Sequence, residues 1–238
     1  MSAKPTLVLI PGLLCDGALW AHQVEALSDI AEVQVADITR ANSMPDLARS
    51  ILHRAPKRFA VAGLSMGGYV AQEILRQQPG RVSHLALVDT NARADLPEQS
   101  ANRKALMDEA EDGRFDEIAP MLLPKLVNAK HANTPAIADV VMQMAQRVGK
   151  DAFLRQQTAI LNRVDGRSDL AEIKCPTLVL CGADDIMTPP AVHQEMADGI
   201  GANATLVVVP DCGHLSPLEQ PGVVSAALRA WLVKGESN

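Results

Sequence analysis

Short apolar runs alternate along the chain with longer stretches in which apolar residues recur every three or four positions. The apolar runs predict buried strands, and the longer stretches predict helices that lay one face against them. Six strands are expected, at Thr6–Ile10, Glu32–Ala36, Phe59–Leu64, His84–Asp89, Thr177–Cys181 and Ala204–Val209. Such alternation is typical of βαβ units, so we expect an α/β fold: a mostly parallel sheet of about six strands with helices on both faces.

Helical periodicity falls between and after these strands. The expected helices are Ala18–Ser28, Pro45–His53, Ser65–Gln78 and Pro217–Val233. Pro45 suits the first turn of a helix, where an N–H group has no acceptor within the helix. The helix from Ser65 follows the strand Phe59–Leu64 without a gap, which predicts a very tight strand-to-helix turn.

The alternation of strand and helix patterns stops between the fourth and fifth strands. From about Pro97 to Leu170 only helical patterns occur, at Ala101–Glu111, Phe115–Val127, Ile137–Val148 and Ala152–Asn162. A connection of this length is too long for one crossover. We therefore expect a helical cap, residues 97–170, inserted into an α/β core of residues 1–96 and 171–238. The alternative is a set of ordinary crossover helices on the sheet face.

Net charge and the lengths of the apolar runs limit the classes of partner that we expect. The 238 residues carry a formal net charge of −6, which disfavours a nucleic-acid partner. No apolar run approaches the ~20 residues of a membrane span, so we expect no membrane partner. The short apolar start lacks a small-residue cleavage site, which favours a cytoplasmic protein. The sequence makes no prediction about oligomeric state.

The cysteines have no spacing typical of a zinc site. A reduced set of four, Cys15, Cys175, Cys181 and Cys212, is the expectation for a cytoplasmic chain. Cys15 and Cys212 flank pieces of the candidate site described below, where small buried packing residues are the simpler interpretation. We expect no metal and no cofactor.

Ser65 is the candidate nucleophile, at the centre of Gly63-Leu64-Ser65-Met66-Gly67. A G-x-S-x-G pattern indicates a nucleophile only where a strand precedes it and a helix follows, and both are expected here. The tight turn requires neighbours without bulk, and the helix N-terminus supplies free N–H groups. The alternative is a glycine-rich turn that merely packs closely.

A serine hydroxyl needs a base to take its proton. His214 follows the last strand directly, at the sheet edge where such sites assemble. His22 is the one rival, because it follows the first loop. The remaining histidines fall in helical or mid-strand patterns and are expected at the surface or in packing: His53, His84, His131 and His193.

The acid that orients the histidine should leave the preceding strand. Asp184 and Asp185 both follow Thr177–Cys181, and the residues alone do not choose between them. Asp89, at the end of the fourth strand, is a third candidate, although a turn residue is its simpler interpretation.

An acyl-transfer site also needs N–H donors for the developing oxyanion. The amide of Met66, directly after the nucleophile, is the first candidate. The loop after the first strand supplies the second, and Gly12 there allows a close backbone approach. Leu13 is therefore the expected second donor.

Four stretches together make the chain resemble the α/β-hydrolase superfamily over nearly its whole length: Leu7–Gly12, Gly63–Gly68, Gly182–Pro189 and Gly213-His214. The resemblance implies the α/β-hydrolase fold, and an acid three residues after the glycine of a G-x-x-D-x-x-x-P pattern, which selects Asp185 over Asp184. The family often has His-Gly in the first loop, where this chain has Pro11-Gly12. The two antiparallel strands that usually lead the sheet are missing from the predicted elements.

Within the superfamily, two stretches resemble the small-esterase and enol-lactonase branch: Gly63–Gly68, the tight turn around Ser65 that we call the elbow, and Asp89–Arg93. The menaquinone-pathway lyase branch usually has an arginine just after the elbow glycines, where this chain has Tyr69. The resemblance thus implies a serine hydrolase that cleaves a small-molecule ester or lactone through Ser65, His214 and Asp185.

Two alternatives remain open. One is a C–C bond hydrolase or lyase of the menaquinone-pathway type with the same three residues, which a charged pocket containing Arg93 or Arg103 would support. The other is a non-catalytic hydrolase-fold protein that binds a ligand.

Overall fold

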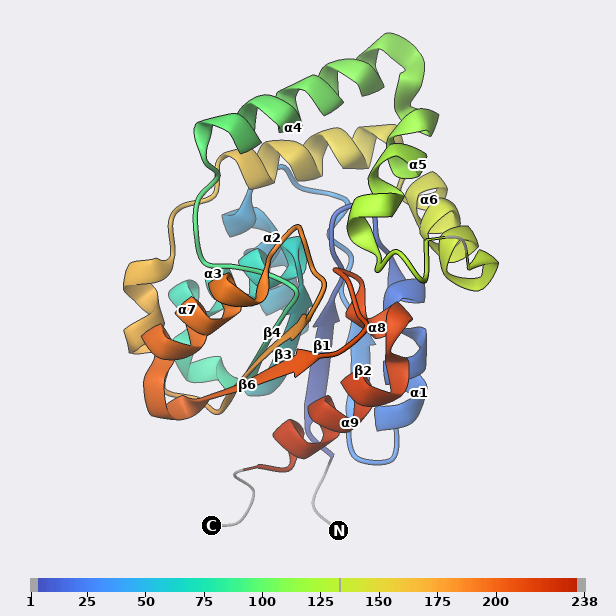
Figure 1. Ribbon diagram of the computed structural model, residues 1–238. Coiled ribbons are helices and arrows are strands. Elements are labelled where there is room, and N and C mark those ends of the chain that lie inside the picture. Colours follow the sequence, from blue (N-terminus) through green and yellow to red (C-terminus); the bar gives the residue numbers. More distant parts are fainter. Residues whose placement is uncertain (1–3, 133, 235–238) are drawn as a thin grey trace.

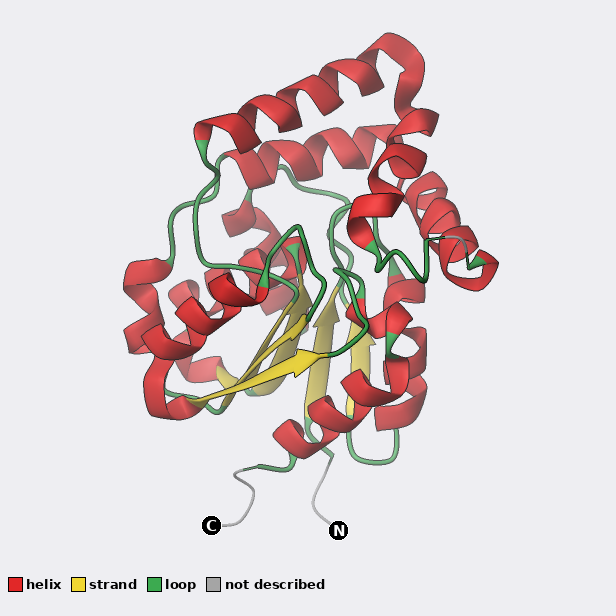
Figure 2. Ribbon diagram, viewed as in Figure 1, coloured by secondary structure: helices red, strands yellow, loops and turns green. Residues whose placement is uncertain are grey.

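The computed structural model describes residues 4–132 and 134–234, and a six-stranded sheet lies at its centre (Figures 1 and 2). The strand order is β2-β1-β3-β4-β5-β6, and every neighbouring pair is parallel. The strands are β1 (Thr6–Ile10), β2 (Glu32–Val35), β3 (Phe59–Leu64), β4 (Val82–Val88), β5 (Thr177–Gly182) and β6 (Ala204–Val209). The six strands of the sequence analysis are confirmed, although β4 begins two residues before His84 and ends before Asp89.

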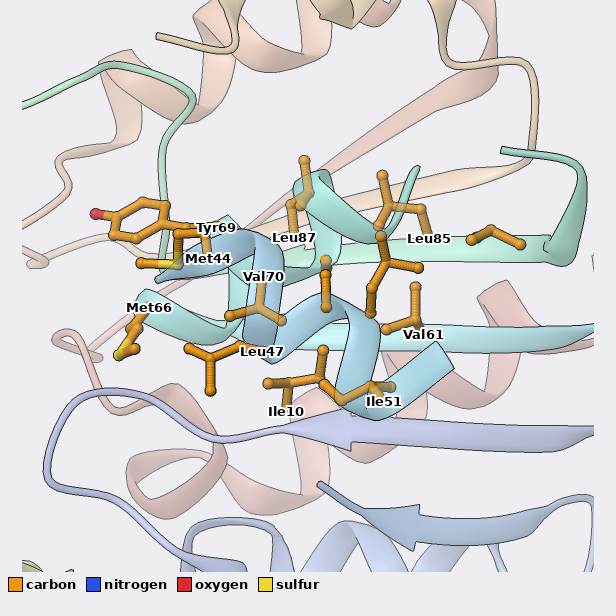
Figure 3. Close-up of a cluster of buried hydrophobic side chains, with 14 of the residues drawn as sticks. Ile10, Met44, Leu47, Ile51, Val61, Met66, Tyr69, Val70, Leu85 and Leu87 are labelled. Carbon is orange, nitrogen blue, oxygen red and sulfur yellow. The ribbon is translucent and has the colours of Figure 1, made fainter. Parts of the chain in front are cut away.

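Helices cover both faces of this sheet (Figure 1). One face carries α2 (Met44–Arg54), α3 (Met66–Gln77) and α7 (Pro190–Ile200), and the other carries α1 (Ala21–Leu27) and α9 (Pro221–Leu232). Successive residues of a strand point to opposite faces. In β1, Val8 and Ile10 accordingly pack in one buried cluster, and Leu7 and Leu9 pack in the other. Figure 3 shows part of the first cluster, between α2, α3 and the sheet.

Three helical segments differ from the expectation. A 3-10 turn at Gly17–Trp20 precedes α1, because the Asp16 carboxylate accepts the Ala18 N–H at 2.9 Å and fixes a separate first turn. The last helix is divided into α8 (Ser216–Glu219) and α9, since Pro221 has no N–H to continue the helix. Helix α7 was not predicted.

Between β4 and β5 the chain is helical, as expected. It forms α4 (Pro97–Glu109), a wide turn at Ala110–Arg114, α5 (Phe115–Leu126) and α6 (Pro135–Leu161). These helices lie beyond the carboxyl ends of the strands (Figure 1). Gly149, with φ 75° and ψ 166°, breaks α6 between the two helices expected there. The division into a core and a cap at residues 97–170 stays a prediction.

We also compared the helices with the length and hydropathy that a lipid bilayer requires. No helix in the described parts of the chain is long and apolar enough to cross a membrane.

Candidate active site

Ser65 occupies the turn between β3 and α3 in a conformation that L-residues rarely adopt. Its φ is 52° and its ψ is −113°. The turn is held by three hydrogen bonds: Ser65 N–H donates to Val88 O at 3.0 Å, Gly68 N–H donates to Ser65 O at 2.9 Å, and Thr90 Oγ1 donates to Ser65 O at 2.8 Å. Strain of this kind, over-determined by its surroundings, is common at functional sites.

The glycines of the elbow are required because other backbone lies against them. A Cβ on Gly63 would lie 2.2 Å from Gly67 O, and a Cβ on Gly67 would lie 2.2 Å from Ile10 O. A Cβ on Gly68 would meet the Thr90 side chain at 2.5 Å. Helix α3 therefore begins in direct contact with β1 and with the segment after β4, which fixes the position of Ser65.

The structure brings Asp185 and His214 together. Both follow strands of the sheet, β5 and β6, and both are buried. Asp185 Oδ2 lies 2.8 Å from His214 Nδ1. The other carboxylate oxygen accepts the Met187 and Thr188 N–H groups at 2.8 and 2.9 Å. Thr188 Oγ1 donates to Asp185 Oδ2 at 2.7 Å, so the carboxylate is held on every side.

The other candidate acids and the rival base have different contacts. Asp184 is exposed and accepts a hydrogen bond from Asn128 Nδ2 at 2.7 Å. Asp89 is buried and accepts the Gly182 N–H at 3.0 Å and the Ser216 N–H at 3.1 Å. His22 Nδ1 lies 2.9 Å from Ser225 Oγ and does not line the pocket that contains Ser65.

Burial and charge set the protonation of these groups. Burial opposes the charged form of His214, but the carboxylates of Asp185, Asp89 and Glu219 outweigh it and raise the pKa of His214. Burial likewise opposes the Asp185 carboxylate, yet His214 and the hydrogen bonds from Thr188 hold the pKa of Asp185 below its ordinary value. Burial, followed by the negative charge of Asp185, raises the pKa of Asp89 to about 8.

Ser65 and His214 line one pocket, which encloses about 810 Å³ including space open to solvent. No hydrogen bond joins Ser65 Oγ to His214 Nε2 in this structure; such contacts often tighten only when substrate binds. The rest of the lining is mostly apolar and comes largely from the helices between β4 and β5, for example Leu106, Leu122 and Val141.

Two backbone N–H groups beside this pocket are free. Neither Leu13 N–H nor Met66 N–H donates to another residue of the described chain. Leu13 belongs to the loop after β1, and its neighbour Leu14, with φ 59°, donates its N–H to Gln156 Oε1 at 3.1 Å. The loop is thereby held from α6 in a conformation that leaves the preceding amide unpaired.

The sequence analysis missed two groups that hold the loop around His214. Thr188 lies within the Gly182–Pro189 motif but had no assigned role. Glu219, in α8, is buried; its Oε1 accepts the N–H groups of Gly213 and Leu215 at 3.0 and 3.2 Å. Its Oε2 accepts the Asn128 N–H at 2.7 Å. A glutamate next to a proline-rich helix start gives no sequence signal for such a contact.

The four cysteines are all free thiols. Cys15 lines the pocket, but burial raises the pKa of its thiol to about 12, so the thiol stays protonated and is a poor nucleophile. Burial also raises the pKa of the Cys212 thiol. Among the described residues, no group of three or more His, Cys, Asp or Glu side chains is placed to hold a metal ion.

Comparison with known proteins places this geometry in a family. Residues 7–227 match the model of the alpha/beta hydrolase family. The chain belongs to the alpha/beta hydrolase family. An esterase from Thermogutta terrifontis, solved with malate bound, is 31% identical, with a TM-score of 0.87 over 96% of this chain and 90% of that one.

Two further alpha/beta hydrolases illustrate the range of relatives. The enol-lactonase from Burkholderia xenovorans LB400 is 26% identical, with a TM-score of 0.88 over 97% of this chain and 92% of that one. A proposed carbamate hydrolase, RutD, from Variovorax paradoxus (strain S110) is 27% identical over 96% of this chain and 91% of its own. The resemblance to small esterases and enol-lactonases is thus confirmed, and these three relatives are all hydrolases by name.

Proposed function

We propose that this alpha/beta hydrolase cleaves a carboxylic ester or a lactone, with Ser65 as nucleophile, His214 as base and Asp185 as the acid that orients the base. The observation that carries the proposal is the 2.8 Å contact of Asp185 Oδ2 with His214 Nδ1, beside a pocket that Ser65 also lines. The esterase and the enol-lactonase among the relatives support the same bond type.

The first steps of the reaction form a tetrahedral intermediate on Ser65. Asp185 accepts the Nδ1–H of His214, which leaves Nε2 without a proton and able to take one from Ser65 Oγ. Ser65 Oγ then attacks the carbonyl carbon, and the carbonyl electron pair becomes an oxyanion. The free N–H groups of Met66 and Leu13 are the proposed donors to that oxyanion. Such donors are each worth roughly a hundredfold to a thousandfold in rate.

The later steps release the alcohol, which forms the acyl-enzyme, and then release the acid. His214 gives its proton to the leaving alkoxide as the C–O bond breaks, which leaves the acyl group on Ser65. Water then attacks the acyl carbon while His214 takes its proton, and the bond to Ser65 Oγ breaks with return of that proton. A lactone follows the same steps, with the alcohol and the acid joined in one product.

A fluorophosphonate probe tests the nucleophile. We expect labelling of the folded protein at Ser65, loss of labelling in Ser65→Ala, and loss of ester hydrolysis in the same variant. Ser168→Ala, at an exposed serine, is the matched control and should label like the wild type. A folded wild-type protein that neither labels nor turns over esters would favour the non-catalytic alternative.

One observation favours a second candidate, cleavage of a C–C bond by the same residues. Arg103 lines the pocket, whereas Arg93 pairs with Glu195 on the surface. A panel of short acyl esters, lactones and β-diketones separates the two activities. Rapid turnover of the diketones alone would replace the ester proposal.

A further inference from the structure

The wall of the pocket carries a charge that the proposed chemistry at Ser65 does not use. Most lining side chains are apolar, but Arg103 from α4 and Gln157 from α6 also line it. Arg103 is only partly exposed, with 21% of its side chain accessible, and Gln157 is fully buried. Burying a charged or amide group costs free energy to the extent that its donors lack hydrogen-bond or charge partners.

The charges around Arg103 do not cancel. Arg103 Nε and Arg163 Nη1 both pair with Asp95, each at 2.7 Å, and the Asp95 side chain is 3% exposed. Two guanidinium groups therefore share one carboxylate. The guanidinium of Arg163 also lies over the Tyr69 ring, 4.3 Å from its centroid.

The charges of the outer pocket, next to solvent, do not change the excess positive charge around Arg103. Glu109 and Lys125 line an outer pocket that shares Ser65 and His214 with the inner one, and they contribute one charge of each sign. Glu109 is also paired with Arg114 on the surface. One positive charge thus remains at Arg103, which lines both pockets.

Gln157 adds a neutral donor beside that charge. Its Oε1 accepts a hydrogen bond from Arg103 Nη1 at 3.0 Å, so the guanidinium fixes which end of the amide faces it. Its Nε2 is buried and has no partner among the described residues. Arg103 Nη2 likewise donates to no other described residue. Both unpaired groups are donors, which selects an acceptor as ligand.

We propose that Arg103 and Gln157 bind a carboxylate on the acyl part of the substrate, so that the enzyme acts on monoesters of dicarboxylic acids. The inference rests on the proposed function of Ser65. A carboxylate offers several acceptor sites to a guanidinium and an amide at once.

The acyl part is the one that fits this wall. Gln157 and the loop after β1, with the Leu13 N–H, line the inner pocket. The outer pocket includes exposed residues such as Gln99 and Met121. His214 and Arg103 line both pockets, whereas Gln157 lines only the inner one. The leaving alcohol, protonated by His214, departs through the outer pocket, while the acyl chain on Ser65 extends toward Gln157 and the face of Arg103 that lines the inner pocket.

A matched pair of esters tests the proposal. The kcat/KM for the mono-p-nitrophenyl ester of glutaric acid is divided by that for p-nitrophenyl pentanoate. Arg103→Met should lower this ratio by about tenfold or more, because a charge-assisted contact is lost. Lys104→Met removes the same charge from the exposed neighbour on α4 and should leave the ratio at its wild-type value.

Arg103→Met also removes a partner of the buried Asp95 carboxylate and could disturb folding. Gln157→Glu is therefore a second variant that tests the same site. The glutamate keeps an acceptor for Arg103 but cancels the excess charge, so the ratio should again fall while pentanoate hydrolysis shows a folded enzyme. Ratios within about twofold of wild type in both variants would overturn the inference.

A binding measurement separates this inference from the proposed function. Glutarate is titrated calorimetrically into Ser65→Ala and into Ser65→Ala with Arg103→Met. Binding that Arg103→Met weakens about tenfold supports the carboxylate site even if Ser65 proves not to be the nucleophile. Equal binding by the two proteins, together with normal esterase activity of the wild type, refutes the carboxylate site and leaves the serine hydrolase standing.

Discussion

The backbone N–H of His214 donates a hydrogen bond to the carbonyl oxygen of Leu126, 2.9 Å away. Leu126 is the last residue of α5, so the loop that carries the candidate base is attached to the helices that line the pocket. Glu219 strengthens the same attachment, because its carboxylate bonds both to the loop and to Asn128, just beyond α5. The position of His214 therefore depends on these helices as well as on β6.

Glu219→Gln should weaken this attachment. A glutamine has one acceptor oxygen where the glutamate has two, so some of the buried N–H groups it serves lose their partner. We expect the free energy of unfolding to fall by about 1–3 kcal/mol and kcat to fall more than KM changes. Urea denaturation and steady-state kinetics measure both. Glu172→Gln, at an exposed glutamate, is the control, and wild-type values in Glu219→Gln would contradict the role.

Asp185→Asn should reduce kcat far more than Asp184→Asn. An asparagine at position 185 no longer fixes the imidazole tautomer, a change that costs roughly 10⁴-fold in comparable sites. The side-chain oxygen left by Asp184→Asn can still accept from Asn128, so kcat of that variant should stay within about twofold of wild type. Steady-state kinetics on one ester decide the matter. Small and equal losses would move the assignment to Asp89.

The pH dependence of kcat/KM should report the carboxylates around His214. The base acts in its neutral form, so activity falls as the pH drops through its pKa, and the raised pKa of His214 places that fall at higher pH than an ordinary histidine would. Asp185→Asn removes the largest influence that raises this pKa. The acid limb should therefore move to lower pH in the residual activity.

A sensitive fluorogenic ester makes this limb measurable in the weakened variant. Asp29→Asn, which changes an exposed carboxylate paired with Arg229, should leave the limb where it is in the wild type. An unchanged limb in Asp185→Asn would show that another group controls the profile.

Gly67→Ala should destabilise the protein strongly. The added Cβ would lie 2.2 Å from Ile10 O and 2.6 Å from Pro11 O, so either β1 or α3 must move. We expect a loss of at least about 1–3 kcal/mol, the usual cost of forcing atoms into a packed interior. Gly80→Ala meets no atom within 4 Å and should unfold like the wild type in the same thermal or urea assay. Equal stability of both variants would refute the close approach.

The sequence predicts best those features that depend on residues close together in the chain. The six strands follow from short apolar runs, and the elbow follows from glycines two residues on either side of Ser65. The choice of Asp185 needed the family resemblance, because neighbouring carboxylates on one loop differ only in which of them the folded loop turns toward His214. Those site roles stay predictions until the variants are measured.

What the sequence did not predict is nonlocal. Gln156 contacts Leu14, 142 positions away, and Glu219 contacts Asn128, 91 positions away. A glutamine or glutamate on a helix normally indicates a solvent-facing surface, so its pattern gives no sign of burial. The pairing of Arg103 with Asp95 is another contact that the sequence does not predict, because the pocket that Arg103 lines is completed by other helices.

The break at Gly149 divides α6 into two halves that both line the pocket, and only the second half holds the loop after β1. The half before it supplies Val141 and Ala145 to the pocket wall, and the half after it supplies Gln157 and Ile160 to the same wall as well as Gln156, which holds the loop after β1. A chimera that took residues 97–148 from a relative would exchange apolar lining and keep the support of that loop. One that continued through Leu161 would also replace Gln156 and Gln157, so a crossover at Gly149 is the point at which recombination between relatives exchanges the first part of the pocket wall and keeps the support of the loop after β1.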